Sequence, residues 1–320
     1  MRVGFLKFGS VFLLGLFLVS WSLPLLYASI PVTVYIYPID EPVEWRGRTF
    51  EMGGSRYWVG EIHIQYGGVP PEGNHTRAYC LQYDVILHTG RSYTYEVVDA
   101  EDTVKWRAVS YVLSWYDPPK DDDEGAAVQG AIWNLTTGYD PSGYGLGLAS
   151  EAYGKDVIRR GDTMEWLTPV GYVGPGEEIT LTVAVKRADD SGADGSGRAG
   201  VRVLFETSAG TLDKDEAFTD SNGEASVTLT APSESCVVEV KAHTRGVWPK
   251  VYLRNGETQD LIGLGDGLEL TLTTEVIVIA RIFVVPEFPF GTIAAVSVCF
   301  LALLIKARRL RWSWHLRPGI

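Results

Sequence analysis

The chain has 320 residues, 46% of them hydrophobic, and a formal net charge of −12 at pH 7. Two basic residues before position 30 and five after position 305 leave a net charge of −19 on the residues between them. A segment this acidic is poorly suited to nucleic acid or to anionic lipid, which excludes both as partners.

The first 29 residues have the features of a secretory signal peptide. Arg2 and Lys7 precede an uncharged apolar run, and Ala28 and Ser29 supply small residues where cleavage is expected. This order of basic, apolar and small residues is typical of an export signal. An uncleaved anchor is the alternative, because a large residue stands where a small one is preferred near the cleavage position.

Residues 30–168 form the first predicted domain. Three stretches are aromatic and β-branched between glycine-rich turns, and we expect strands there: Val32–Tyr37, Tyr57–Tyr66 and Ala78–Leu87. The apolar spacing then changes to a helical period over Val104–Tyr116, after a possible Asp102 cap.

A second helix is expected after the polar loop Asp117–Gly125, and it ends at Gly138. Its apolar face consists of Val128, Ala131, Ile132 and Leu135. The acidic residues at 121–124 suit the positive end of a helix dipole, so no metal is needed to explain them. Strands with a helical insert predict an α+β domain, a β-sandwich or barrel that carries helices.

A Pro- and Gly-rich stretch at 168–176 predicts a domain boundary, and residues 169–284 form the second domain. Apolar and polar residues alternate there in four runs: 179–185, 201–205, 225–229 and 236–240. Short strands without a helical period predict an all-β sandwich. The stretch 203–229 resembles the bacterial Ig-like domains of invasin-type adhesins, which implies a stalk. We interpret the acidic loop at 189–194 as solvated rather than calcium-binding, because no Glu closes it.

Residues 285–305 are expected to end in a transmembrane helix. Eighteen uncharged residues lie between Glu287 and Lys306, and as a helix they span about 27 Å, close to the hydrocarbon thickness of a bilayer. Only basic charges follow, which predicts that the tail 306–320 is cytoplasmic and that both domains lie at the cell surface.

The segment before this helix carries a short motif, Pro286-Glu287-Phe288. Together with the helix and the basic tail, it resembles the C-terminal sorting signals read by archaeal archaeosortases. The resemblance implies cleavage near the motif and transfer of the protein to a lipid. Retention of the helix is the alternative, and the chain is membrane-anchored in both cases.

The cysteine count is odd. Cys299 lies in the predicted membrane helix and Cys236 points toward the predicted sandwich core, so both are interpreted as structural. Cys80 has no partner in its own domain. Because an exposed thiol outside the cell is readily oxidised, we expect Cys80 to be buried, oxidised or chemically occupied.

Two short motifs then make a specific resemblance. Ala78-Tyr79-Cys80-Leu81 and Val128-Gln129-Gly130-Ala131-Ile132-Trp133 resemble the motifs of the thioester domains found on Gram-positive surface adhesins. In that family an aromatic–Cys–apolar element ends a strand, and a helix carries the pattern apolar–Gln–small–Ala–Ile–Trp. Val128 stands where the family commonly has Thr, at a position that does no chemistry.

The resemblance implies that the Cys80 sulfur attacks the Gln129 side-chain amide, releases ammonia and leaves an internal thioester. We expect backbone N–H groups to stabilise the amide oxygen, and the positive end of the second helix to favour the thiolate. Aromatic residues near the motifs are candidates to keep water off the bond, although such residues are usually core. They are Tyr79, Trp115, Tyr116 and Trp133.

The predicted function is that of a covalent adhesin. A target amine, typically a Lys side chain on a surface protein or an amine on a glycan, attacks the Gln129 carbonyl in a single-use acyl transfer. This is not a turnover enzyme, and it needs no cofactor and no metal.

Two alternatives remain open. The chain is a non-covalent envelope or binding module with an inert Cys80, or a cysteine hydrolase or transglutaminase-like enzyme that pairs Cys80 with His75 or His88. The sequons at Asn74 and Asn134 are candidate glycosylation sites.

Overall fold

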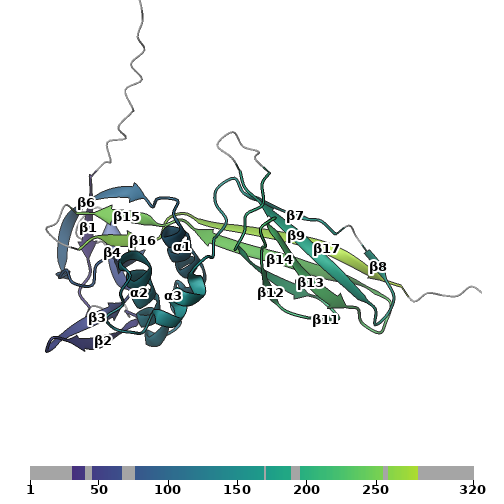
Figure 1. Ribbon diagram of the computed structural model, residues 1–320, viewed down its shortest axis with the longest axis horizontal. Coiled ribbons are helices and arrows are strands. Elements are labelled where there is room, and N and C mark those ends of the chain that lie inside the picture. Colours follow the sequence, from purple (N-terminus) through teal and green to yellow (C-terminus); the bar gives the residue numbers. More distant parts are fainter. Residues whose placement is uncertain are drawn as a thin grey trace, which may run out of the picture.

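The computed structural model describes residues 31–39, 45–66, 76–168, 171–188, 195–254 and 259–279. These residues form a closed barrel with three helices and a two-sheet sandwich, arranged end to end (Figure 1). The predicted signal peptide 1–29, the sorting motif and transmembrane helix 285–305, and the tail 306–320 lie outside the described residues. Within the described ranges, no helix is long and apolar enough to cross a membrane.

Six antiparallel strands close the barrel in the order β1–β4–β5–β16–β15–β6. They are β1 Pro31–Ile36, β4 Ile62–Tyr66, β5 Thr76–Cys80, β16 Leu261–Gly263, β15 Lys250–Leu253 and β6 Arg91–Asp99. A hairpin of β2 Gly47–Met52 and β3 Ser55–Gly60 stands beside the barrel. Aliphatic side chains and two tyrosines fill the barrel core, among them Val34, Ile36, Ile64, Tyr95 and Tyr252.

Two of the predicted strands are shorter than expected. The stretch 57–66 is interrupted at Glu61, whose buried carboxylate accepts a hydrogen bond from the Arg46 N–H where the hairpin turns into the barrel. The stretch 78–87 ends as a strand at Cys80. Leu81 donates its N–H to the carbonyl of Asp260, and the side chain of Gln82 bonds the same residue, so the chain leaves the sheet there.

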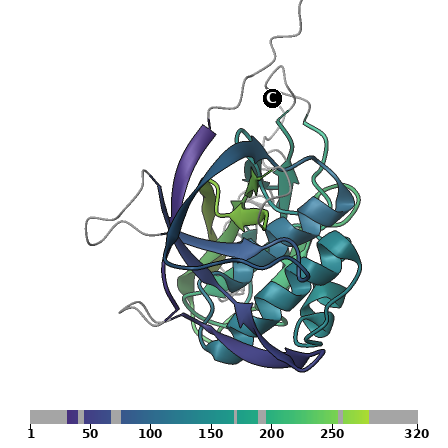
Figure 2. The same cartoon turned by 90° about the vertical axis from the view of Figure 1, so that its left-hand side faces the viewer.

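Three helices stack on one side of the barrel (Figure 2): α1 Val104–Tyr116, α2 Asp122–Thr137 and α3 Leu146–Ala152. The bounds of α1 are those expected, but its N-cap is Thr103. Asp102 instead pairs with Arg107 and Arg159. The helix α2 begins at the Asp121 N-cap, which accepts from the N–H of Glu124, and it ends at Gly138 with φ of 81°, as predicted.

The sandwich has the predicted alternating strands. One sheet has the order β12 Glu216–Phe218, β10 Arg202–Thr207, β14 Cys236–Val247, β17 Gly267–Val278 and β8 Gly171–Val173. The other has the order β11 Thr211–Leu212, β13 Glu224–Thr230, β9 Glu178–Lys186 and β7 Thr163–Trp166. Inward-facing Val, Leu, Ala and Phe residues form the core between the sheets, and Cys236 packs against it, partly buried. The acidic loop 189–194 lies outside the described residues.

The predicted boundary at 168/169 is wrong in two respects. The strand β7 lies before it but pairs with β9 in the sandwich. After β14, the chain returns to the barrel and supplies β15 and β16 before β17 runs back through the sandwich. Alternation of apolar residues identifies a strand but not the sheet that it joins, so the sequence pattern assigned 250–263 to the wrong domain.

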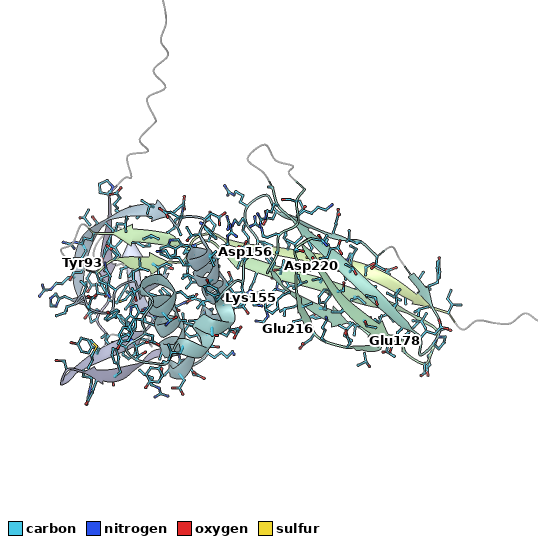
Figure 3. All side chains as sticks on the ribbon, in the orientation of Figure 1. Tyr93, Lys155, Asp156, Glu178, Glu216 and Asp220 are labelled. Carbon is cyan, nitrogen blue, oxygen red and sulfur yellow. The ribbon has the colours of Figure 1, made fainter. Side chains whose placement is uncertain are left out.

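Buried charges connect the barrel unit to the sandwich. Arg198 of the sandwich pairs with both Asp156 and Asp162, and all three side chains are almost fully buried. Figure 3 labels Asp156 and Lys155 at this junction. The Lys155 ammonium lies 3.4 Å from the centre of the Phe218 ring. The chain also passes between the two units three times, from α3 to β7, from β14 to β15 and from β16 to β17, so the units are tied together.

Candidate functional site

Cys80 is the last residue of β5, and one edge of its backbone has no strand neighbour. On the β16 side Cys80 lies opposite Leu261. On the β4 side the ladder ends two residues earlier, where Ile62 faces Ala78. The N–H and C=O of Cys80 on that side are therefore available to another partner.

The side chain of Gln129 is that partner. Its Oε1 accepts a hydrogen bond from the Cys80 N–H at 2.8 Å, and its Nε2 donates to the Cys80 carbonyl at 2.8 Å. Gln129 projects from α2 and is 1% exposed. The two residues that the sequence singled out are thus brought into direct contact, with the Gln129 amide in the place that a neighbouring strand would take.

Contacts at the N-terminal end of α2 fix the position of Gln129. Gly125 packs against the Arg46 backbone so closely that a Cβ at this position would lie 2.4 Å from the Arg46 carbonyl oxygen. The Gly47 N–H donates to Asp122, and Arg48 pairs with Asp123. The hairpin region therefore contacts the first turn of α2, and these contacts fix the position of the helix relative to β5.

The hydrogen bond to Oε1 has a chemical consequence. An N–H group that donates to an amide oxygen polarises the carbonyl and stabilises negative charge on that oxygen when a nucleophile adds. The donor belongs to Cys80, the residue that also carries the sulfur. The expectation of a backbone donor for this oxygen is confirmed.

The expectation that the helix terminus favours a Cys80 thiolate is wrong. Burial raises the pKa of the Cys80 thiol to about 12, and a hydrogen bond from the Gln259 side chain opposes this shift. The field of a helix end is confined to about its first turn. Gln129 stands nearly two turns inside α2, whose first turn is acidic. At neutral pH the sulfur therefore carries its proton.

Gln259 is a site residue that sequence reasoning missed. Its side chain is 3% exposed and donates to the carbonyl of Gln82, just beyond Cys80. The Tyr95 hydroxyl donates to the Gln259 backbone carbonyl at 3.3 Å. Gln259 precedes β16 in the segment that was assigned to the sandwich, and no local pattern in the sequence points to it.

Only one of the four predicted shielding residues lies beside Cys80. Trp133 is buried and packs in one cluster with Cys80, Val59, Phe50 and Tyr83. The prediction that Tyr79 shields the site is wrong. Tyr79 and Cys80 are successive residues of β5, so their side chains point to opposite faces of the sheet. The Tyr79 hydroxyl donates to the buried Asp117 at 2.8 Å.

The two aromatic residues at the end of α1, Trp115 and Tyr116, do not line the cavity beside Cys80. The Trp115 ring is 4.8 Å from the guanidinium carbons of both Arg202 and Arg245, which belong to the sandwich. The Tyr116 hydroxyl donates to Glu151 of α3 at 2.7 Å. Trp115 is therefore part of the contact between the helices and the sandwich, and Tyr116 is part of the contact between α1 and α3.

A cavity of about 630 Å³ opens beside Cys80. It is bounded by the hairpin, the segment 83–89 and the Cys80–Trp133 contact. Its lining consists of Ile39, Trp45, Met52, Ser55, Arg56, Tyr57, Trp58, Ile62, Cys80, Tyr83, Asp84, Val85, Ile86, Leu87, Thr89, Trp133 and Gln259. Of the described residues that line it, none is a histidine, so His88 does not share this cavity with Cys80.

The remaining predicted positions bear less directly on the site. Asn134 lies on α2, half-buried, while Asn74 and His75 lie outside the described residues. In the part of the chain that the structure describes, no three His, Cys, Asp or Glu side chains are grouped to hold a metal ion.

Comparison with known proteins gives structural likenesses alone. No family model matches the chain, and no curated protein matches it. Among solved structures, it is similar to the thioester domain of the Enterococcus faecium TIE86 protein, at 11% identity and a TM-score of 0.29, over 77% of this chain and 96% of that one.

It is also similar to the Bacillus anthracis TIE protein, at 13% identity and a TM-score of 0.31, over 77% of this chain and 48% of that one. The D0–D1 domain of intimin is similar at 23% identity and a TM-score of 0.20, over 34% of this chain and 46% of that one. These values do not assign the chain to a family, so the function has to be argued from the contacts of Cys80 and Gln129.

Proposed function

We propose that this protein is a cell-surface adhesin in which Cys80 and Gln129 form an internal thioester that acylates an amine on a partner surface. The observation that carries the proposal is the double hydrogen bond between the Gln129 amide and the Cys80 backbone. The contact of a buried glutamine amide with the backbone of the residue that bears a thiol supports a reaction between the two side chains.

The bond-forming step balances without a cofactor. The Cys80 sulfur adds to Cδ of Gln129, the Cδ–Nε2 bond breaks, and the thiol proton leaves with the nitrogen as ammonia. The Cys80 N–H stabilises charge on Oε1 during the addition. Contact between the reacting groups replaces a bimolecular encounter, which contributes up to about 7–11 kcal/mol in well-oriented systems.

The second step transfers the acyl group. A neutral amine attacks Cδ of Gln129, the Cδ–Sγ bond breaks, and one amine proton moves to the sulfur. The products are an amide bond to the partner and the free thiol of Cys80. Because the site ends in an unreactive amide, the proposed transfer occurs once per molecule and is not a turnover reaction.

The shape of the molecule is consistent with a surface role. The barrel stands at one end, and β17 ends at the other end of the sandwich, beside β8 (Figure 1). The proposed export signal and anchor are sequence predictions. An anchor that follows residue 284 would attach at the sandwich end and leave Cys80 and Gln129 at the outer end.

Labelling with methylamine tests this function. We expect methylamine to add to Gln129 of the purified protein and to release one thiol, both located by peptide mass spectrometry. The Cys80→Ala variant is the matched control and should take up none. If the wild type takes up no methylamine and Cys80→Ala binds the target surface equally well, the protein is a non-covalent binding module.

A further inference from the structure

The cavity beside Cys80 has an apolar interior and a polar rim. Its walls include Trp58 and Tyr57 of the hairpin, Tyr83 and Leu87 of the following segment, and Trp133 of α2. Arg56 and Asp84 are the charged residues among the described lining, and both are exposed. Aromatic and aliphatic side chains therefore form most of the walls, and the Gln259 amide is the polar group beside the sulfur.

Two large aliphatic side chains extend this apolar lining onto the outer surface. Ile86 is 67% exposed and Ile39 is 42% exposed, and both line the cavity. Exposed apolar side chains that surround a cavity are typical of a ligand or partner site. A volume of about 630 Å³ lies within the common range for ligand sites, and it exceeds what one lysine side chain fills.

We infer that this cavity selects a lysine of a partner protein whose neighbouring side chain is large and apolar, rather than an amine on a sugar ring. The inference rests on the proposed function and names its substrate class. The methylene stem of the lysine and the adjacent apolar group lie against Trp58, Tyr83 and Ile86. Cys80 lines the cavity whereas Gln129 is buried and does not, so the nitrogen reaches the Gln129 carbonyl past the Cys80 sulfur.

The chemistry of the attacking group supports the same occupant. Only the neutral amine is a nucleophile, and an apolar environment disfavours the charged ammonium form. No acidic group stands among the described buried lining residues to hold the ammonium. A sugar amine is surrounded by hydroxyl groups, and the aromatic and aliphatic walls of the cavity leave those that face them without hydrogen bonds.

A series of straight-chain amines tests the inference on the purified protein. Ethylamine, n-butylamine and n-hexylamine carry the same reacting group and differ in methylene number. We expect the second-order rate constant for addition to Gln129, measured by intact mass, to rise about fourfold for each added methylene, the factor expected for burial of one CH₂. With every rate constant expressed per concentration of the neutral amine, glucosamine should react more slowly than ethylamine.

Exposed positions supply the matched variants, since their replacement leaves the folded core intact. The double variant Ile39→Ser/Ile86→Ser should reduce the increase per methylene to less than twofold. Val237→Ser is the control, because Val237 is 57% exposed on β14 and does not line the cavity. This control should keep the wild-type dependence on chain length.

The two possible failures differ in their readout. Equal rate constants for the three alkylamines, with adducts formed at Gln129, would overturn the inferred selectivity and leave the thioester intact. A glucosamine rate above that of n-hexylamine would overturn it as well. Absence of any adduct with every amine would overturn the proposed function, and the inference with it.

Discussion

The Gln129 side chain contacts Cys80 through both polar atoms of its amide, Oε1 to the backbone N–H and Nε2 to the backbone carbonyl. The amide is therefore placed relative to the backbone of the residue that carries the sulfur. Rotation about χ1 of Cys80 then brings its Sγ into one of three staggered positions. The geometry of attack depends on a single side-chain torsion of Cys80.

The double hydrogen bond predicts a specific loss of stability. In a Cys80→Ala background, Gln129→Glu replaces the Nε2 donor with a second acceptor that faces the Cys80 carbonyl. We expect the free energy of unfolding, measured by urea denaturation, to fall by about 1–3 kcal/mol. Equal stability of Cys80→Ala with and without Gln129→Glu would contradict the contact.

The raised pKa of Cys80 predicts an unusual pH dependence. In Gln129→Met, a change of similar volume that prevents thioester formation, the thiol should stay protonated at neutral pH. Because its pKa is about 12, the rate of alkylation by iodoacetamide should rise about tenfold per pH unit from pH 8 to pH 11. A rate that levels off near pH 9 would show an unburied thiol.

Gln259 is expected to assist thioester formation. Its side chain hydrogen bonds the Cys80 sulfur, and a bond to a charged group contributes about 1.5–3 kcal/mol. Gln259→Leu should slow ammonia loss after refolding roughly 10- to 100-fold, followed by intact mass. Gln65→Leu is the control, because Gln65 is also a buried barrel glutamine but lies outside the Cys80 cavity. Equal slowing in both variants would indicate a purely structural effect.

The return of the chain to the barrel predicts which fragments fold. Residues 31–168 lack β15, β16 and Gln259, so they cannot close the barrel. We expect this fragment to show no cooperative thermal unfolding by circular dichroism, whereas residues 31–279 should show it. Cooperative unfolding of 31–168 at the same midpoint would contradict the shared barrel.

The buried charges at the junction predict a large effect of one substitution. Arg198→Ala leaves Asp156 and Asp162 buried without their shared cation, which should lower the free energy of unfolding by about 3–5 kcal/mol. Arg48→Ala removes an exposed pair with Asp123 and should lower the free energy of unfolding far less, because solvent screens an exposed pair. Similar values for the two variants in urea denaturation would contradict this difference.

Local patterns in the sequence predicted the elements that carry the Cys80–Gln129 pair. The apolar period of 104–116 predicted the bounds of α1, and Gly138 predicted the end of α2, because spacing and capping are local properties. The alternation of apolar and polar residues also predicted strands of the sandwich. The Cys80 and Gln129 motifs led to a contact that the structure contains.

The sequence did not predict the features that depend on pairing between strands far apart in the chain. The strands β15 and β16 alternate like those of the sandwich, and only the closed ladder with β5 and β6 places them in the barrel. Gln259 comes to the site with them. Trp115 and Tyr116 were expected at Cys80 because they end a neighbouring helix, but Trp115 packs against Arg202 of the sandwich and Tyr116 bonds Glu151 of α3.

Intact-mass spectrometry of residues 31–279 tests the central claim most directly. If Cys80 and Gln129 form a thioester, the protein weighs one ammonia less than its sequence, and the Cys80→Ala and Gln129→Met variants have their full sequence masses. A wild-type protein that keeps its full sequence mass, with Cys80 as a free thiol, would contradict the account.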